Sequence, residues 1–196
     1  KDRDWSGWYD MGLWGSAEPQ PRYTSDPVYG PLKVDQLVAA VPFDFIQYRI
    51  CFYASSGGES PVLRLVSLSY SHVGEGEIDA QLMRAAGGKK VSLRVPWISQ
   101  LKPEDVEDEA MRKAGVCAPT SVTMVLNTLG RKTRVAETAR HGFDPVANIF
   151  GNWAFLSATA GDFGFDAYVR RFNNWSEVRS FIEKGTPVII SVGIAS

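Results

Sequence analysis

The sequence predicts an α+β protein, and three patterns in it lead to that prediction. Residues 46–52 alternate apolar and polar side chains with a period of two, as in a half-buried β-strand. Residues 119–130 carry apolar side chains at helical spacing, and residues 187–192 form a continuous apolar run as long as a buried strand. These helical and strand patterns occur together without a regular βαβ alternation, which favours α+β over doubly wound α/β.

The composition changes along the chain in a way that predicts two domains. Residues 1–88 are rich in aromatic and turn-forming residues, and a second strand pattern at 62–70 follows a Ser-Ser-Gly-Gly turn. Residues 85–90 are small or charged, which is typical of a linker. We therefore expect a small, β-rich, sandwich-like accessory domain over 1–88 and a second domain over 89–196.

The first helix of the second domain is the clearest element of the sequence. It follows a short alternating strand at 91–95, and Pro119 suits its first turn because proline lacks an N–H group that would be unpaired there anyway. Gly130 suits the position after its last residue. The buried stripe at i, i+3, i+4 and i+7 consists of Val122, Val125, Leu126 and Leu129.

A second helix is predicted after Asn174. Asn174 and Glu177 have capping-box spacing, and Gly185 ends the helical pattern before the apolar run at 187–192. The acidic residues within 102–113 are interpreted as a solvated face, with a docking site for a basic substrate as the alternative.

Charge and composition exclude several classes of protein. The 196 residues include 21 Lys and Arg against 22 Asp and Glu, a net charge of -1, which offers no electrostatic footprint for nucleic acid or an anionic membrane. No apolar run approaches the ~20 residues of a membrane-spanning helix. Two cysteines and two histidines do not make a rich metal site, and the sequence contains no phosphate-binding loop. We expect neither a metal nor a cofactor.

Cys117 has the sharpest chemical meaning of any residue in the chain. It stands immediately before the helix that Pro119 opens. The unpaired N–H groups and the positive dipole end of a helix stabilise a thiolate, and they also provide donors for an oxyanion during acyl transfer. The alternative is that Cys117 is a small buried hydrophobe, as free cysteines commonly are.

The context of Cys117 resembles a known family of enzymes. The chain contains VPWISQ at 95–100, CAPTSVTMVL at 117–126, and a helix, a Gly-x-Pro turn and a buried strand over 182–192. Between them lie FDPV at 143–146, GNWAF at 151–155, AGDFG at 160–164 and AYVRRF at 167–172. Over residues 91–196 these blocks resemble cysteine peptidase family 39 and its relatives. That group comprises the bacteriocin-processing, double-glycine peptidase-like enzymes of papain fold, and the similarity is closest to their stand-alone bacterial branch.

The resemblance implies roles for particular residues. Cys117 matches the nucleophile of the family, and Gln100 matches a glutamine that supplies an oxyanion-hole amide, although 16 residues intervene here. Asn152 and Trp153 either line the substrate site or form a structural turn with a buried Trp. The family's histidine matches neither His72 nor His141. We therefore expect it to lie beyond Ser196, so that residues 89–196 are the first half of a papain-like domain and the chain as given is inactive.

The function expected from this resemblance is that of a papain-like cysteine hydrolase acting on peptide or peptidoglycan-peptide amide bonds. An amidase or transferase using the same acyl-enzyme is not distinguished from it, and the alternative is a non-catalytic binding or surface protein that retains the papain-like shell. We expect a bacterial protein, secreted or in the cell envelope, whose signal peptide has been removed. The aromatic residues of the accessory domain either contact glycans or fill a β-rich core; they include Trp5, Trp8, Tyr9, Trp14 and Tyr23.

Overall fold

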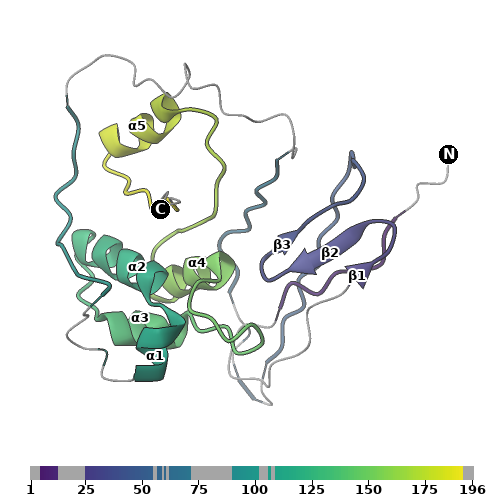
Figure 1. The fold of residues 1–196 in the computed structure, drawn as a ribbon, viewed down its shortest axis with the longest axis horizontal. Coiled ribbons are helices and arrows are strands. Elements are labelled where there is room, and N and C mark those ends of the chain that lie inside the picture. The colour runs from purple at the N-terminus through teal and green to yellow at the C-terminus, as the bar shows by residue number, and fades with distance from the viewer. Residues whose placement is uncertain are drawn as a thin grey trace.

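The computed structural model describes residues 5–12, 25–54, 57–58, 60, 62–71, 90–101, 106 and 109–191. Within them, three short strands precede five helices along the chain (Figure 1). A small antiparallel sheet and a group of helices in one chain agree with the α+β prediction. None of the described helices is long and apolar enough to cross a membrane.

The strands form a small antiparallel sheet in the order β1-β2-β3. β1 (Ser25–Asp26), β2 (Gly30–Lys33) and β3 (Gln36–Leu37) are joined by tight turns. Gly30 has a φ of 104°, and a Cβ atom at this position would lie 2.2 Å from the carbonyl oxygen of Val38, so glycine is required there. This sheet lies outside both stretches of the accessory region that the alternating pattern marked as strands.

Four stretches that the sequence analysis predicted as strands are not strands in the structure. Within the described residues, 46–52, 62–70, 91–95 and 187–191 belong to no hydrogen-bonded ladder. The alternating pattern correctly describes a chain with one apolar face, but a strand also needs a neighbour to pair with. The sandwich-like arrangement expected for 1–88 is not observed in the part of that region that the structure describes.

Two of the five described helices were predicted from the sequence. The five are α1 (Glu109–Ala114), α2 (Cys117–Thr128), α3 (Val135–His141), α4 (Trp153–Asp162) and α5 (Trp175–Glu183), of which α1, α3 and α4 were not predicted. Helix α2 confirms the first predicted helix, since Val122 and Leu126 of the stripe are buried, and Gly130 follows it with a φ of 90°. Leu129, predicted as the last member of the stripe, is 41% exposed because it caps the helix.

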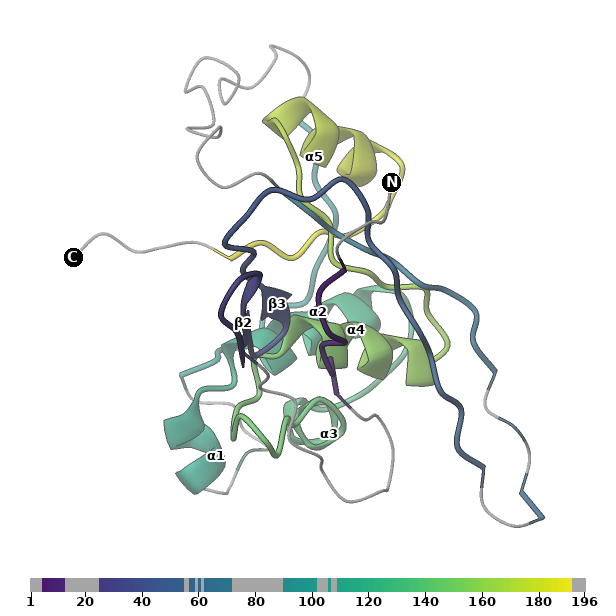
Figure 2. The ribbon, with the colours of Figure 1, turned by 90° about the vertical axis from the view of Figure 1, so that its right-hand side faces the viewer.

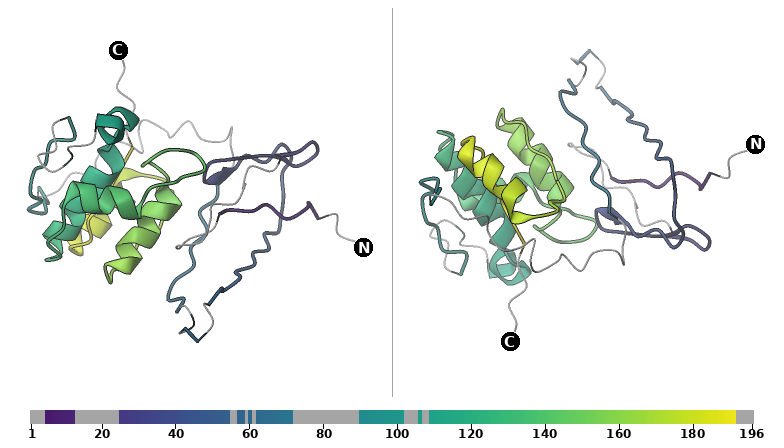
Figure 3. Two further views of the ribbon diagram at one scale, coloured as in Figure 1. Left: turned by 90° about the horizontal axis from the view of Figure 1, so that it is seen from below. Right: turned by 90° about the horizontal axis from the view of Figure 1, so that it is seen from above.

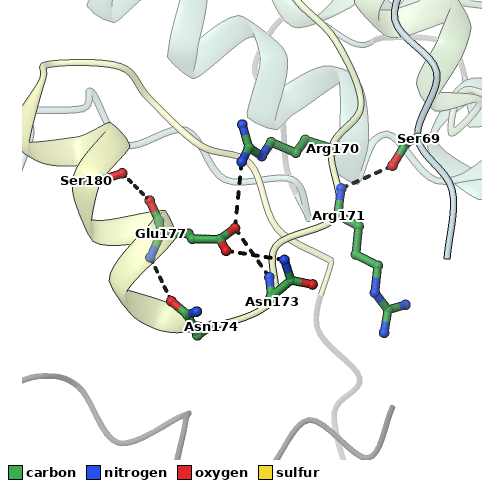
Figure 4. A network of polar contacts seen from close by, with 7 residues as sticks. All are labelled: Ser69, Arg170, Arg171, Asn173, Asn174, Glu177 and Ser180. Carbon is green, nitrogen blue, oxygen red and sulfur yellow. Dashed lines mark hydrogen bonds and ion pairs between the residues drawn. The ribbon is translucent and has the colours of Figure 1, made fainter. Parts of the chain in front are cut away.

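Helix α5 confirms the second predicted helix and its cap. The Asn174 side chain accepts a hydrogen bond from the Glu177 N–H at 2.9 Å (Figure 4). The Glu177 carboxylate in turn accepts from the backbone N–H of Asn173 and lies 3.7 Å from the Arg170 guanidinium. In a capping box the side chain at Glu177 would accept from the N–H of the cap residue, Asn174. Here it accepts from the N–H of Asn173 instead, so this is a variant of the capping box.

The core lies among α2, α3 and α4, which pack against one another below α5 in the view of Figure 1. It consists of two clusters of buried side chains. The first cluster contains Val106, Val116, Val135 and Ala136, with Ile98 and Met111 packed against it. The second contains Val122, Leu126, Leu156 and Ala160, with Ala118, Phe163, Phe165 and Ala167 packed against it.

Side-chain contacts join the described residues on the two sides of the predicted domain boundary. The Asp35 carboxylate accepts from the Trp153 N–H at 3.0 Å, at the start of α4. Near the other end of α4, the Arg64 guanidinium donates to the carbonyl of Gly161 at 2.9 Å. A third contact joins Ser69 to the backbone N–H of Arg171 (Figure 4). The boundary near residue 88 remains a prediction, but α4 clearly serves as a contact surface for the accessory region.

Candidate functional site

Cys117 is the first residue of α2, and its side chain is exposed. The structure therefore contradicts the alternative in which Cys117 is a small buried hydrophobe. Its neighbours on both sides are anchored, because Val116 is 2% exposed in the first cluster and Ala118 packs against the second. The Cys117 thiol is therefore open to solvent, while the backbone on either side of it is held by the two clusters of the core.

The first turn of α2 leaves two backbone donors beside the thiol. In a helix the first N–H groups have no acceptor within the helix. The Thr120 N–H donates to the carbonyl of Val116 at 2.9 Å, and Pro119 has no N–H. Val116 provides no side-chain cap, so the N–H groups of Cys117 and Ala118 donate to no acceptor in the described part of the chain. These two donors can hold an anion that forms next to the sulfur.

A buried pair of threonines ties α2 to α3. The Thr123 hydroxyl donates within the helix to the carbonyl of Pro119 at 2.9 Å and lies 2.9 Å from the Thr138 hydroxyl. Both threonines are 0% exposed. Because hydrogen bonds between buried hydroxyls have strict geometry, this pair limits how far the N-terminal half of α2 can rotate against α3. The position of Cys117 is correspondingly restricted.

Gln100 lies at an exposed bend, two residues after Ile98, which packs against the first cluster. That cluster also contains Val116, so the segment that carries Gln100 and the start of α2 share one core. Among the described residues, Gln100 makes no hydrogen bond to Cys117. Half of the acidic segment 102–113 lies outside the described residues, and the oxyanion role of Gln100 stays a prediction.

Asn152 and Trp153 occupy the start of α4, with different environments. Asn152 is 1% exposed: its side-chain oxygen accepts from the Phe155 N–H at 3.1 Å and its side-chain nitrogen donates to Asp144 at 2.8 Å. Asp144 also accepts from two backbone N–H groups of its own loop. Trp153 is 43% exposed. Both residues remain predicted substrate contacts, and the geometry leaves the surface of Trp153 the more accessible of the two.

His141 ends α3 on the surface of the helical group. One of its ring nitrogens lies 3.9 Å from the Asp162 carboxylate, and its ring lies 5.3 Å from that of Phe163 between centroids. His141 shares no hydrogen bond with Cys117 in the described structure. His72 lies outside the described residues. Of the two histidines, His141 is the one that the structure describes, and it is not paired with the thiol.

Glu137, one turn before His141, has a carboxyl whose pKa is lowered. The Thr133 hydroxyl donates to it at 2.7 Å, and this bond is the largest cause that lowers the pKa of Glu137. The backbone of Arg134 and the charges of Arg131 and His141 act in the same direction, while burial opposes them. Glu137 is therefore an ionised group that stabilises the start of α3 and has no proton to donate at neutral pH.

Sequence reasoning missed three polar residues that shape this region. Asp144 carries a weak signal in its Phe-Asp-Pro context, because aspartate before proline favours a turn. Asp35 carries none, since its partner Trp153 is 118 positions away. Thr120 lies on α2 one turn after Cys117, and its buried hydroxyl has no hydrogen-bond partner among the described residues. An unpaired buried hydroxyl is visible only in the folded chain.

Replacing Thr120 by valine is expected to leave the free energy of unfolding unchanged or to raise it by up to about 1 kcal/mol, because valine has nearly the same shape and removes an unpaired buried hydroxyl. Thr123→Val is the matched control on the same helix. It removes a paired hydroxyl and should lower the free energy of unfolding by about 1–3 kcal/mol. Urea denaturation of both variants checks this, and equal losses would show that Thr120 has a partner in solution.

Two tryptophans of the predicted glycan-contact set are exposed. Trp5 is 49% and Trp8 is 53% exposed, and the Arg49 guanidinium lies 4.3 Å from the ring centroid of Trp8. The Tyr9 hydroxyl donates to the carbonyl of Gly30 at 2.7 Å, while Trp14 and Tyr23 lie outside the described residues. Glycan contact stays a prediction. Among the described residues, no group of three or more His, Cys, Asp or Glu side chains could hold a metal ion.

Comparison with known proteins bears on the second half of the chain. Residues 92–196, more than half of the chain, match the model of the family described as Peptidase_C39 like. No curated protein and no solved structure matches the chain significantly. The matched range contains Gln100, Cys117, Asn152 and Trp153, and it agrees with the family that the sequence blocks indicated.

Proposed function

Because the chain belongs to the peptidase C39-like family through residues 92–196, we propose that it is a papain-like cysteine hydrolase that cleaves peptide or peptidoglycan-peptide amide bonds. Membership of this family identifies the chain as cysteine peptidase-like. The assignment of Cys117 as nucleophile and of a peptide as substrate is the proposal.

The observation that carries the proposal is the environment of Cys117. Its thiol is exposed, its backbone is anchored on both sides, and the N–H groups of Cys117 and Ala118 are available as donors. Acyl transfer needs these three things together: an accessible nucleophile, a fixed position and preorganised donors where the oxyanion develops.

The proposed reaction proceeds through a thioester. The Cys117 thiolate attacks the carbonyl carbon of the amide, a C–S bond forms, and the carbonyl oxygen takes the negative charge. The Cys117 N–H and the Gln100 carboxamide hold that oxygen. Collapse of the intermediate breaks the C–N bond, and the leaving amine takes the proton that the base removed from the thiol. Water then hydrolyses the thioester. The resemblance implies a histidine as base, at a position that neither His72 nor His141 matches.

The rate of thiol alkylation at Cys117 and at Cys51 tests this environment within one molecule. Both cysteines are exposed, but Cys51 lies outside any helix. With iodoacetamide near neutral pH, Cys117 should react at least severalfold faster, because a helix N-terminus stabilises a thiolate. Peptide mapping by mass spectrometry after a time series separates the two sites. Equal rates over the whole pH range would contradict an activated Cys117.

The second candidate function is a non-catalytic binding protein that retains the shell of the family. One observation favours it: no histidine is hydrogen-bonded to Cys117 in the described residues. The two functions differ in turnover by the full-length protein. A binding protein predicts no cleavage of peptides even if Cys117 is alkylated fast, because the helix start is part of the retained shell, whereas the hydrolase predicts cleavage that depends on Cys117.

A further inference from the structure

Helix α4 is held at both ends by residues of the accessory region. At its start the Asp35 carboxylate accepts from the Trp153 N–H at 3.0 Å, and near its end the Arg64 guanidinium donates to the carbonyl of Gly161 at 2.9 Å. A negative charge thus lies at the positive end of the helix dipole and a positive charge at the negative end. Both contacts have the sign that stabilises the helix.

The Trp153 N–H needs an acceptor from outside the helix. Trp153 is the first residue of α4, and the first N–H groups of a helix have no acceptor within it. The side-chain oxygen of the cap residue, Asn152, accepts from the Phe155 N–H instead. The acceptor for Trp153 is Asp35, which lies 118 positions earlier in the chain. The start of α4 is therefore fixed jointly by its own cap and by the accessory region.

Asp35 is presented to α4 by a strained two-residue turn. Val34 and Asp35 connect β2 to β3, which pair with Lys33 opposite Gln36. Val34 has a φ of 52°, a conformation that a β-branched residue rarely adopts. Both views of Figure 3 show this turn against the segment that leads into α4. Such strain persists only where the surrounding structure determines it, and it is concentrated at functional contacts.

The start of α4 lies at the same end of the core as Cys117. Helices α2 and α4 lie side by side (Figures 1 and 2) and share the second cluster. Just beyond their C-terminal ends, the Arg131 guanidinium lies 5.1 Å from the ring centroid of Phe163, so the two helices end together. They therefore run in the same direction, and their first residues, Cys117 and Trp153, lie at one end of the pair. Trp153 is 43% exposed there.

We propose that Asp35 is a positioning residue of the hydrolase: it fixes the backbone of Trp153, and with it the exposed indole, at the Cys117 end of the core. The accessory region thereby sets the affinity for the peptide substrate. This inference rests on the proposed function, in which Trp153 contacts the substrate. An aromatic surface that is already held in place binds with less loss of conformational entropy than a mobile one. Because Asp35 acts through the backbone of Trp153, it affects substrate binding and not the chemical step.

The kinetics of Asp35→Ala in the full-length protein test this role. KM should rise at least about fivefold while kcat stays within about twofold, because the contact contributes equally to binding of substrate and transition state. Asp35→Asn keeps an acceptor oxygen and should restore most of the affinity. Asp44→Ala is the matched control: it removes an exposed carboxylate elsewhere in the accessory region and should leave both constants unchanged. An unchanged KM in Asp35→Ala, a fall in kcat alone, or an equal effect of Asp44→Ala would overturn the proposal.

A Trp153→Ala background shows whether Asp35 acts through Trp153. Trp153→Ala should itself raise KM. Adding Asp35→Ala should then raise KM no further, because the indole that Asp35 positions is gone and the two effects are coupled. Effects that multiply independently would show that Asp35 acts elsewhere and would refute its role as a positioning residue for Trp153.

Exchange of the Trp153 backbone amide tests the contact without reference to activity. The chain has six tryptophans, so isotopic labelling of tryptophan nitrogen gives few NMR signals, and Trp153→Phe assigns the one of interest. In Asp35→Ala this amide should exchange with solvent at least about tenfold faster, because it loses its acceptor, and in Asp44→Ala it should not. Equal exchange in all three proteins would overturn the contact. Faster exchange in Asp35→Ala in a full-length protein that cleaves no peptide would refute the proposed function, and the role in affinity with it, while leaving the contact in place.

Discussion

In the full-length protein, replacing Cys117 by alanine is expected to abolish peptide hydrolysis, with a loss in kcat/KM of at least about 10³-fold. The sulfur atom forms the bond to the acyl group, and the Ser121 hydroxyl, one turn further along α2, is engaged with the carbonyl of Cys117 at 3.0 Å. The donors of the first turn remain in the variant, so any residual rate measures what oxyanion stabilisation alone contributes. The measurement is turnover of a quenched-fluorescent peptide mixture and of peptidoglycan peptides, with products identified by mass spectrometry.

Cys51→Ala is the matched control for this experiment. Cys51 is equally free and exposed, but it lies far along the chain from the helix start. Its replacement should leave hydrolysis unchanged, and circular dichroism should show both variants folded. Turnover that survives in Cys117→Ala would refute the proposed mechanism while leaving the family membership intact, since that membership rests on the whole of residues 92–196.

Replacing Leu126 by alanine is expected to lower the free energy of unfolding by about 2–5 kcal/mol. Leu126 is 1% exposed and packs with Val122, Leu156 and Ala160 between α2 and α4. The substitution removes buried methyl groups and leaves a cavity that the helices fill only in part. Because this cluster also anchors Ala118, loosening it should also reduce the selectivity of alkylation for Cys117 over Cys51.

The control for this cavity is Leu129→Ala on the same helix. Leu129 belongs to the same sequence pattern, but it is 41% exposed at the C-terminal cap. Replacing Leu129 by alanine should lower the free energy of unfolding by less than about 1 kcal/mol, because the side chain is already largely exposed and little buried apolar surface is lost. Urea denaturation of the two variants side by side measures the difference. Equal losses would mean that the stripe faces the core along its whole length in solution.

Two of the five described helices, α2 and α5, could be predicted because their signals are local, whereas α1, α3 and α4 were not predicted. The spacing of Val122 and Leu126, the proline in the first turn and the glycine after the last turn all act within a few residues of one another. The same holds for Asn174 and Glu177, whose hydrogen bond closes within one turn. Such signals do not depend on where the rest of the chain lies, and the structure confirms both helices.

The strands could not be predicted because pairing is not local. Residues 46–52 have the alternation of a strand, yet within the described chain they have no partner, while the short strands that do pair lie at 25–37. Alternation reports that a chain has one apolar face; whether another strand lies within hydrogen-bond reach depends on the whole fold.

For the site, the sequence by itself placed Cys117 immediately before a helix and in the context of a peptidase family. Only the tertiary structure decided that its thiol is exposed and that its neighbours are anchored in two different clusters. It also decided that Asp35 reaches the start of α4. The physical reason is the range of the interactions: caps and helical spacing act over four residues, whereas exposure and packing are set by contacts between segments that the sequence separates widely.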